Sequence, residues 1–203
     1  MADFGAKESK WLYDAVKRIF DVLAALLFGS LFLIPMAVFA VWIMLDSPGP
    51  AIYRQERLGT DGKPFVMLKF RSMYLNAEQD GPRMTERQDR RCTPFGRMLR
   101  HTHLDELPQL WNILAGDMSF VGPRPERAFY YKVISQTVPD FSKRLVVRPG
   151  LTGLAQINGG YYLKPEKKLE YDLEYIQSRS IWMDLKCLIG TVRLLFYQRK
   201  DGT

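Results

Sequence analysis

The sequence has only two cysteines, Cys92 and Cys187, which lie far apart and form no Cys-x-x-Cys pattern. They indicate neither a disulfide framework nor a zinc site, and they fit a reducing compartment. Internal repeats and low-complexity tracts are also absent, so one ordinary folded domain is expected. No Asp-x-Asp triplet occurs, which argues against the metal-dependent glycosyltransferases that use one.

Charged residues are absent from residues 22–45. At about 1.5 Å per residue, a straight helix over this run would measure roughly 36 Å, enough for a hydrocarbon core of about 30 Å. Pro35 lies in the middle of the run and predicts a kink there, because proline lacks a backbone donor and clashes with the preceding turn. Each half alone is too short to cross a bilayer.

Basic residues flank this apolar run on both sides. Because Lys and Arg are enriched in cytoplasmic flanks, both ends are predicted to be cytoplasmic. A re-entrant membrane helix, bent at Pro35, satisfies both flanks, and a kinked transmembrane helix is the alternative. A signal peptide is disfavoured, because no small-x-small cleavage site follows the run. The flanking residues are Lys10, Lys17 and Arg18 before the run, and Arg54, Arg57, Lys63, Lys69 and Arg71 after it.

The segment Ser47-Pro48-Gly49-Pro50 is expected to separate two parts of the 203-residue chain. Residues 1–46 would form an amphipathic segment and the membrane helix, and residues 47–203 a catalytic domain. The net charge of +7 and the pI near 9.4 suit a partner that carries phosphates, such as nucleic acid, anionic lipid or a nucleotide-like substrate. Simple juxtamembrane basicity is the alternative source of part of this excess.

The soluble part is predicted to be α+β and mainly helical. Strands over residues 51–58 and 64–73 are joined around Asp61-Gly62, a strong hairpin signal. In the second strand, Val66, Leu68 and Phe70 should share one face. Residues 74–92 suggest an exposed loop or short helix, and residues 143–160 are rich in Gly and Arg. Helices are predicted over residues 93–100, 106–115, 126–136 and 181–198, with Gly116 ending the second.

The last predicted helix has an apolar face, which suits either the membrane interface or packing into the domain core. The sequence leaves these two alternatives open. The residues of this face are Ile181, Leu185, Leu188, Ile189, Val192, Leu195 and Phe196.

The segment 104–110 has the strongest chemical signal. Pro108 is tolerated only in the first turn of a helix, which predicts Asp105 near the N-cap, beside Glu106. Free N–H groups and the positive end of the helix dipole would favour the ionised form of Asp105 and could receive a phosphate. Such a carboxylate could act as an aspartyl nucleophile or bind Mg²⁺. The simpler alternative is a plain helix cap.

Several Lys and Arg residues lie in segments bounded by Gly, Pro or strand ends, and this favours the interpretation of a phosphate-binding site. Arg124 lies between two prolines, so its backbone is largely fixed and its guanidinium can be aimed at phosphate oxygens. For each of these residues, a solvated surface position is the alternative. The set consists of Lys69, Arg71, Arg100, Arg124, Arg144 and Arg148.

Five motifs together resemble the bacterial sugar transferase family, whose members are monotopic polyprenyl-phosphate phosphoglycosyl transferases. The resemblance extends from Lys17-Arg18 and Phe20-Asp21 to Trp182-Met183-Asp184-Leu185-Lys186, so it covers nearly the whole chain. It also implies that the membrane run is re-entrant, and that the chain is the minimal catalytic form. The motifs are Lys69-Phe70-Arg71-Ser72-Met73, Leu104-Asp105-Glu106-Leu107-Pro108-Gln109-Leu110, Gly116-Asp117-Met118-Ser119, Val121-Gly122-Pro123-Arg124-Pro125 and Pro149-Gly150-Leu151-Thr152-Gly153.

The resemblance implies transfer of a sugar-1-phosphate from a UDP-sugar to undecaprenyl phosphate, with UMP released and Mg²⁺ as cofactor. The reaction would be ping-pong, through a phosphosugar on Asp105, which would also bind the metal. Glu106 would support it by organising metal or handling protons. The implied place is the bacterial inner membrane, with interfacial amphipathic helices around a site on the cytoplasmic face. The predicted substrate-binding residues are Lys69, Arg71, Arg100, Arg124, Arg148 and Asp172.

One position departs from the family pattern, because many relatives carry a basic residue where this chain has Gly160. This leaves the local contact to sugar or nucleotide open. A glycerolipid acyltransferase is disfavoured, since His101 and Asp105 are separated by three residues instead of four. The charge allows a nucleic-acid binder, but no recognised motif supports one, so no nucleic-acid partner is expected. The sugar and the oligomeric state are not determined by the sequence, and a non-catalytic membrane scaffold remains the non-enzymatic alternative.

Overall fold

The computed structural model describes residues 10–79, 81–83, 89–160 and 163–198. The structure is mainly helical with a small antiparallel sheet, as predicted. The helices are α1 (Trp11–Leu31), α2 (Leu33–Asp46), α3 (Pro94–His101), α4 (Gln109–Ala115), α5 (Ala128–Thr137), α6 (Leu154–Ile157), α7 (Pro165–Ser178) and α8 (Ile181–Gln198), with 3₁₀ turns η1 (Thr60–Gly62), η2 (Leu104–Glu106) and η3 (Phe141–Val146). The strands are β1 (Ile52–Leu58), β2 (Pro64–Phe70), β3 (Ser119–Val121) and β4 (Gly150–Thr152).

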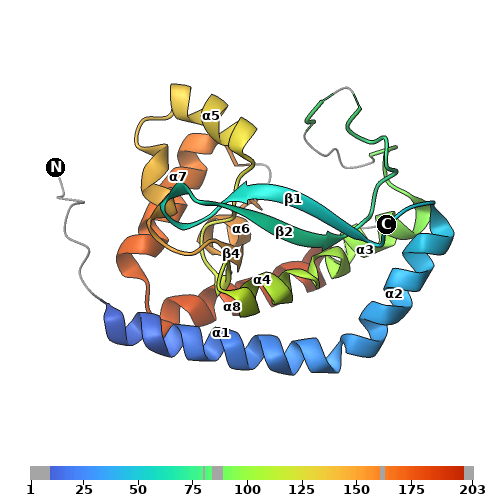
Figure 1. Ribbon diagram of the computed structural model, residues 1–203. Helices are drawn as coiled ribbons and strands as arrows, with labels where there is room; N and C mark the ends of the chain where they lie inside the picture. The colour runs from blue at the N-terminus through green and yellow to red at the C-terminus, as the bar shows by residue number, and fades with distance from the viewer. Residues whose placement is uncertain (1–9, 80, 84–88, 161–162, 199–203) are drawn as a thin grey trace.

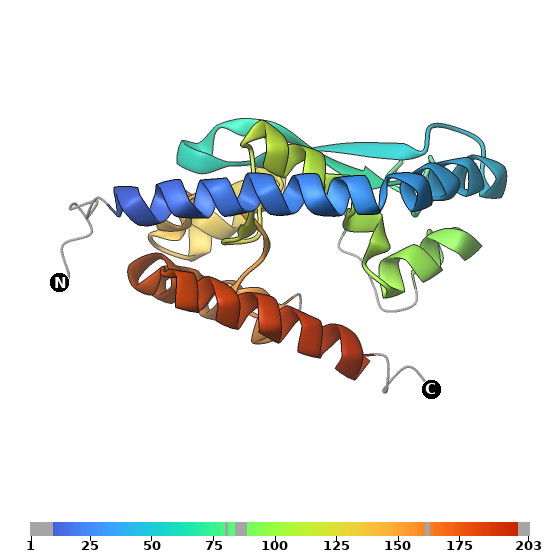
Figure 2. The same ribbon diagram turned by 90° about the horizontal axis from the view of Figure 1, so that it is seen from below.

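The long helices α1 and α8 form the lower side of the molecule, and the β1–β2 hairpin lies above them (Figure 1). Seen from below, α1 continues into α2, and α8 runs beside α1 at an angle (Figure 2). Helices α5 and α7 lie at the end of the molecule opposite α2 (Figure 1).

The N-terminal helix bends by 62°, but the break is at Phe32 instead of at Pro35. Pro35 lies in the first turn of α2, where its missing N–H costs least. The carbonyl four residues before a proline is the one its ring displaces, and here that carbonyl belongs to Leu31, the last residue of α1. The predicted kink exists, and its position before the proline follows from this geometry.

Among the described residues, neither α1 nor α2 alone has the length and hydropathy to cross a bilayer, whereas the bent pair together has both. Large apolar side chains cover the exposed surface of both helices. On α1 they include Leu12, Ile19, Leu23, Leu27 and Leu31, and on α2 Leu33, Ile34, Val41, Trp42 and Leu45.

The predicted hairpin is confirmed: β1 and β2 pair antiparallel, from Ile52 opposite Phe70 to Leu58 opposite Pro64. Asp61 and Gly62 both have positive φ, 55° and 74°, as the sequence signal indicated.

Burial in β2 does not follow a single face, because Val66 is 49% exposed, whereas Met67 and Phe70 are each 2% exposed. Met67 packs into the main core, and Phe70 packs against Ile43 of α2 and Leu99 of α3. Different elements thus cover the two faces of this strand along its length, so a single alternation does not describe it.

The outer edge of β2 is covered by one side chain of α4. Asn112 accepts a hydrogen bond from the N–H of Leu68 at 2.9 Å and donates to the carbonyl of Val66 at 2.7 Å. These contacts satisfy backbone groups that an edge strand would otherwise leave open. They also fix which side of α4 faces the hairpin.

The main core joins elements from the whole chain, from Ala25 of α1 to Cys187 of α8, and both are fully buried. Its centre includes the parallel pair β3–β4, in which Ser119 pairs with Gly150 and Val121 with Thr152. Residues 1–46 therefore contribute to the same core as the rest, and the proposed division at residue 46 stays a prediction about function.

Asp184 joins the first helix to the last two. Its carboxylate accepts hydrogen bonds from Tyr13 at 2.9 Å, Tyr175 at 2.8 Å and Lys17 at 3.0 Å. One side of α8 therefore packs inward, through Cys187 and Met183, while another side stays exposed. The structure therefore supports packing of α8 into the core, and its exposed side still suits the membrane interface. The side chain of Phe196 lies outside the described residues. The exposed residues include Ile181, Trp182, Leu185, Ile189, Val192 and Leu195.

Candidate active site

Asp105 and Glu106 lie in the 3₁₀ turn η2, and α4 begins only at Gln109. The expected position of Asp105 at the N-cap of a helix starting near residue 106 is therefore wrong. The reason is Pro108, which has no N–H to donate to the carbonyl of residue 104, so the helical hydrogen-bond ladder starts later. His103, with φ of 56°, turns the chain into η2.

Asp105 is 5% exposed, and its Oδ1 is buried without a hydrogen-bond partner in the described structure. Burial raises the pKa of Asp105, while Lys69 and Arg100 pull it down and Glu106 adds to the rise. The expectation that its position favours ionisation is thus reversed by desolvation. The carboxylate depends on nearby cations to stay charged.

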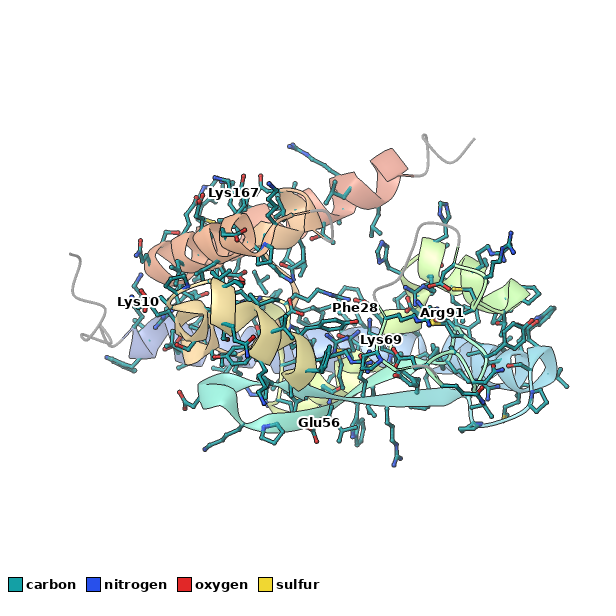
Figure 3. The ribbon with its side chains drawn as sticks, turned by 90° about the horizontal axis from the view of Figure 1, so that it is seen from above. Lys10, Phe28, Glu56, Lys69, Arg91 and Lys167 are labelled. Carbon is teal, nitrogen blue, oxygen red and sulfur yellow. The ribbon has the colours of Figure 1, made fainter. Side chains whose placement is uncertain are left out.

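Glu106 is held between two cations from distant segments. Lys69 Nζ lies 2.7 Å from its Oε1, and Arg124 contacts both carboxylate oxygens, with Nη1 3.4 Å from Oε2. Burial alone would raise the pKa of Glu106, but Arg124 and Lys69 outweigh it, so the pKa is lowered. Lys69 lies near the middle of the molecule, whereas Glu56 on β1 lies at its margin (Figure 3).

Arg124 is positioned by its backbone as well as by Glu106. Its carbonyl accepts from Arg144 Nη2 at 2.9 Å, and its Nη1 donates to the carbonyl of Leu151 at 3.4 Å. The loop of residues 122–125 lies so close to its neighbour that a Cβ on Gly122 would come within 2.4 Å of the carbonyl oxygen of Arg148. Only glycine fits there.

Asp172 is 1% exposed and lies behind the loop, where Oδ2 is 2.7 Å from Arg144 Nη2. Burial raises the pKa of Asp172 against the opposing effect of Arg144. Asp172 therefore supports Arg144, which holds the backbone of Arg124. Asp172 was predicted to bind substrate; in the structure its contacts connect it to the site through Arg144 and the backbone of Arg124.

The remaining predicted cations are divided between the site and other places. Arg100 on α3 is half-buried and acts electrostatically on Asp105. Arg148 is exposed. Arg71 is buried at the end of α2, where it donates to the carbonyls of Pro48 at 2.8 Å, Ser47 and Ile43. The structure therefore brings Lys69, Arg100 and Arg124 to the Asp105–Glu106 pair, and Arg71 to α2.

Two residues near Asp105 were missed by the sequence analysis. His103 lowers the pKa of Asp105. Gln109 is fully buried on the first turn of α4. For Gln109 a signal existed, since it follows Asp105 by four residues, the spacing that places two side chains on one side of a helix.

For the predicted Mg²⁺, the described residues hold no cluster of three or more His, Cys, Asp or Glu side chains that could bind a metal ion. Glu106 is engaged by Lys69 and Arg124, while Asp105 keeps one unpartnered oxygen. Mg²⁺ is often bound by one or two carboxylates together with substrate phosphates. The unpartnered oxygen of Asp105 fits a magnesium ion held in that way, and the metal itself stays a prediction.

Comparison with known proteins identifies the family of this chain. The sequence model described as bacterial sugar transferase matches residues 12–198. The chain belongs to this family. The expected resemblance is thereby confirmed, and the match runs from α1 to the end of α8.

Several relatives have assigned activities. The chain is 45% identical, over 88% of its length and 69% of the relative's, to UDP-glucose:undecaprenyl-phosphate glucose-1-phosphate transferase of Caulobacter vibrioides. It is 39% identical to UDP-N-acetylgalactosamine-undecaprenyl-phosphate N-acetylgalactosaminephosphotransferase of Aeromonas hydrophila, covering 91% of the chain but 44% of that protein. It is 40% identical to the exopolysaccharide production protein PSS of Rhizobium leguminosarum, and the match covers 87% of this chain and 93% of that protein.

Proposed function

We propose that this protein transfers a sugar-1-phosphate from a UDP-sugar to undecaprenyl phosphate and releases UMP, as a membrane step of bacterial glycoconjugate synthesis. The observation that carries the proposal is Asp105, a buried carboxylate with an unpartnered oxygen beside Lys69 and Arg100. The names of the relatives support the two substrates. UDP-glucose and UDP-N-acetylgalactosamine are the first donors to test.

In the first step, a carboxylate oxygen of Asp105 attacks the sugar-bearing phosphorus of the donor. The P–O bond to the bridging oxygen breaks, and that oxygen leaves with UMP. In the second step, a phosphate oxygen of the acceptor attacks the same phosphorus and breaks the bond to Asp105. The product is a polyprenyl diphosphate sugar, and the carboxylate is regenerated, so the cycle is ping-pong.

Three cations would stabilise the negative charge in both steps. Lys69 and Arg124 are aimed by Glu106, and Arg100 approaches from α3. Bound at Asp105 and the donor phosphates, Mg²⁺ would neutralise charge on the phosphate oxygens. Glu106 has a lowered pKa, which suits a fixed anion better than a proton carrier.

We further propose that α1 and α2 together form a bent, re-entrant membrane helix in the cytoplasmic leaflet of the bacterial inner membrane. The 62° bend and the exposed apolar side chains of both helices support this proposal. Residues 47–203 would then act on the cytoplasmic face, where the acceptor phosphate and a water-soluble nucleotide can meet. Membrane lipids are the expected partners, and nucleic acid is not.

The test of the nucleophile is UMP release in a single turnover by the Asp105→Asn variant. We expect no UMP, because an amide cannot replace the attacking carboxylate, whereas Asp61→Asn in the hairpin turn should behave as wild type. Mass spectrometry of wild-type protein incubated with donor alone should show a phosphosugar adduct on Asp105. Continued turnover by the Asp105→Asn variant would falsify the assignment.

A further inference from the structure

Gln109 has a side-chain amide that no described group uses. The residue is fully buried, and both Nε2 and Oε1 lack a hydrogen-bond partner in the described part of the chain. Buried polar side-chain atoms are nearly always paired, and leaving one unpaired is costly. A buried amide with two unpaired atoms therefore calls for a reason.

The direction of this amide follows from its neighbours. Residues 109 and 112 are three positions apart on α4, so their side chains share one side, and Asp105 lies in the 3₁₀ turn that leads directly into this helix. The contacts of Asn112 with Val66 and Leu68 show that this side faces β2. Gln109 thus lies between Asn112 and Asp105.

Lys69, one of the cations at Asp105, lies on β2, the strand that Asn112 contacts. Lys69 follows directly after the residues that Asn112 binds, and it contacts Glu106, the neighbour of Asp105. The Oδ1 atom of Asp105 is itself buried without a partner, and no hydrogen bond joins it to Gln109. Two buried side chains with unpaired polar atoms therefore lie four residues apart on the segment that carries the reacting carboxylate.

We propose that Gln109 is a catalytic residue that binds the sugar-phosphate group while this group is attached to Asp105. Its Nε2 would donate to a phosphoryl oxygen, and its Oε1 would accept from a sugar hydroxyl. A sugar phosphate offers both partners, which matches an amide whose two ends are both unpaired. This inference rests on the proposed function, and it adds a neutral contact that is the same in both half-reactions.

The experiment compares Gln109→Leu with Asn112→Leu, two truncations of buried amides on one helix. Donor is added at saturation to purified detergent-solubilised protein, and single-turnover UMP release is measured per folded molecule, with melting temperature measured in parallel. For Gln109→Leu we expect release slowed by about 10- to 100-fold, the range for loss of one hydrogen bond to a charged oxygen. Its melting temperature should be unchanged or higher, because an unpaired polar group is removed.

Asn112→Leu should show the opposite pattern, a lower melting temperature, since it leaves two backbone groups of β2 unpaired. If Gln109→Leu fails to fold, Gln109→Met provides a flexible apolar replacement for the same measurement. Normal release per folded molecule in the Gln109 variant, with a lowered melting temperature, overturns the inference and assigns Gln109 to packing. Asp105→Asn separates the two proposals: if it blocks release while the Gln109 variant does not, only this inference fails.

Discussion

Asp105 and Glu106 are adjacent, yet the structure shifts their pKa values in opposite directions. Burial dominates at Asp105 and raises its pKa, whereas Arg124 and Lys69 lower that of Glu106. A pair of carboxylates with divergent pKa values is an arrangement found where two such groups have different roles. The sequence showed the pair, but the partners that separate it are 37 and 18 positions away from Glu106, beyond any local pattern.

Replacing Glu106 with Gln should weaken the fold and the reaction together. The neutral amide leaves Lys69 and Arg124 without their shared anion, so the free energy of unfolding should fall by about 1.5–3 kcal/mol, the range for a hydrogen bond to a charged group. Denaturant unfolding in detergent measures this change. Glu56→Gln on the exposed side of β1 is the matched control and should stay within about 0.5 kcal/mol of wild type. Equal stability of the Glu106 and Glu56 variants would contradict the ion-pair account.

Glu126 gives a pH-dependent prediction. Burial would raise its pKa, but Lys168 and Arg144 outweigh this, so the pKa in the folded state is lowered. The stabilisation is therefore complete above the unfolded-state pKa of about 4.3 and is lost as the pH falls below it. The stability difference between wild type and Glu126→Gln should shrink from pH 6 to pH 3. A difference that is constant over this range would show that the two cations do not act on this carboxylate.

At the scale of elements, the sequence predicted the hairpin and most helices better than their boundaries, but it missed α6 and α7. Thr93 caps α3 as predicted, with its Oγ1 accepting from Gly96 N–H at 3.0 Å. The pair β3–β4 was missed, because strands of three residues show no alternation and depend on contacts between residues 119–121 and 150–152. The bend before Pro35 and the late start of α4 show that proline acts on carbonyls upstream of its own position.

Arg71 connects the end of α2 to the strand that carries Lys69. Its three carbonyl partners belong to Ile43, Ser47 and Pro48. Nearby, Asp46 Oδ2 accepts from the N–H of Phe95 at 3.1 Å in the first turn of α3, the helix of Arg100. The end of α2 therefore contacts both β2, which carries Lys69, and α3, which carries Arg100.

Arg71→Lys should lower the free energy of unfolding by about 1–3 kcal/mol, because a single ammonium cannot reach three divergent carbonyls and leaves buried acceptors unpaired. Thermal or denaturant unfolding is the measurement, with Arg54→Lys on exposed β1 as the control. If Arg71→Lys instead keeps its stability and raises the KM for the donor, Arg71 contacts substrate, as the sequence first suggested.

At the scale of the molecule, α1, α2 and α8 all leave apolar side chains exposed, and α8 runs beside α1 (Figure 2). Together with the net charge of +7, this surface suits an anionic bilayer. The family resemblance predicted this orientation, whereas periodicity left α8 undecided. The contacts of Cys187 and Asp184 are among those that show which side of α8 is turned inward.

Vesicle flotation tests the exposed side of α8. Leu185→Glu and Val192→Glu place charge at positions that are 42% and 51% exposed, so binding to anionic vesicles should fall while melting temperature stays near wild type. Ser135→Glu on exposed α5 makes a similar charge change away from this surface and should leave flotation unaltered. Unchanged flotation of both α8 variants would restrict membrane contact to α1 and α2.

The contact between Tyr13 and Asp184 spans 171 positions. During translation at about 5–20 residues per second, the carboxylate of Asp184 is synthesised roughly 10–30 s after Tyr13. Until then the apolar side of α1 has no partner from α8, and Tyr13 and Lys17 have no acceptor there. Arg18 can donate to the carbonyls of Ile113 and Leu114 on α4 much earlier in synthesis, so the contact with Asp184 completes the packing of α1 instead of starting it.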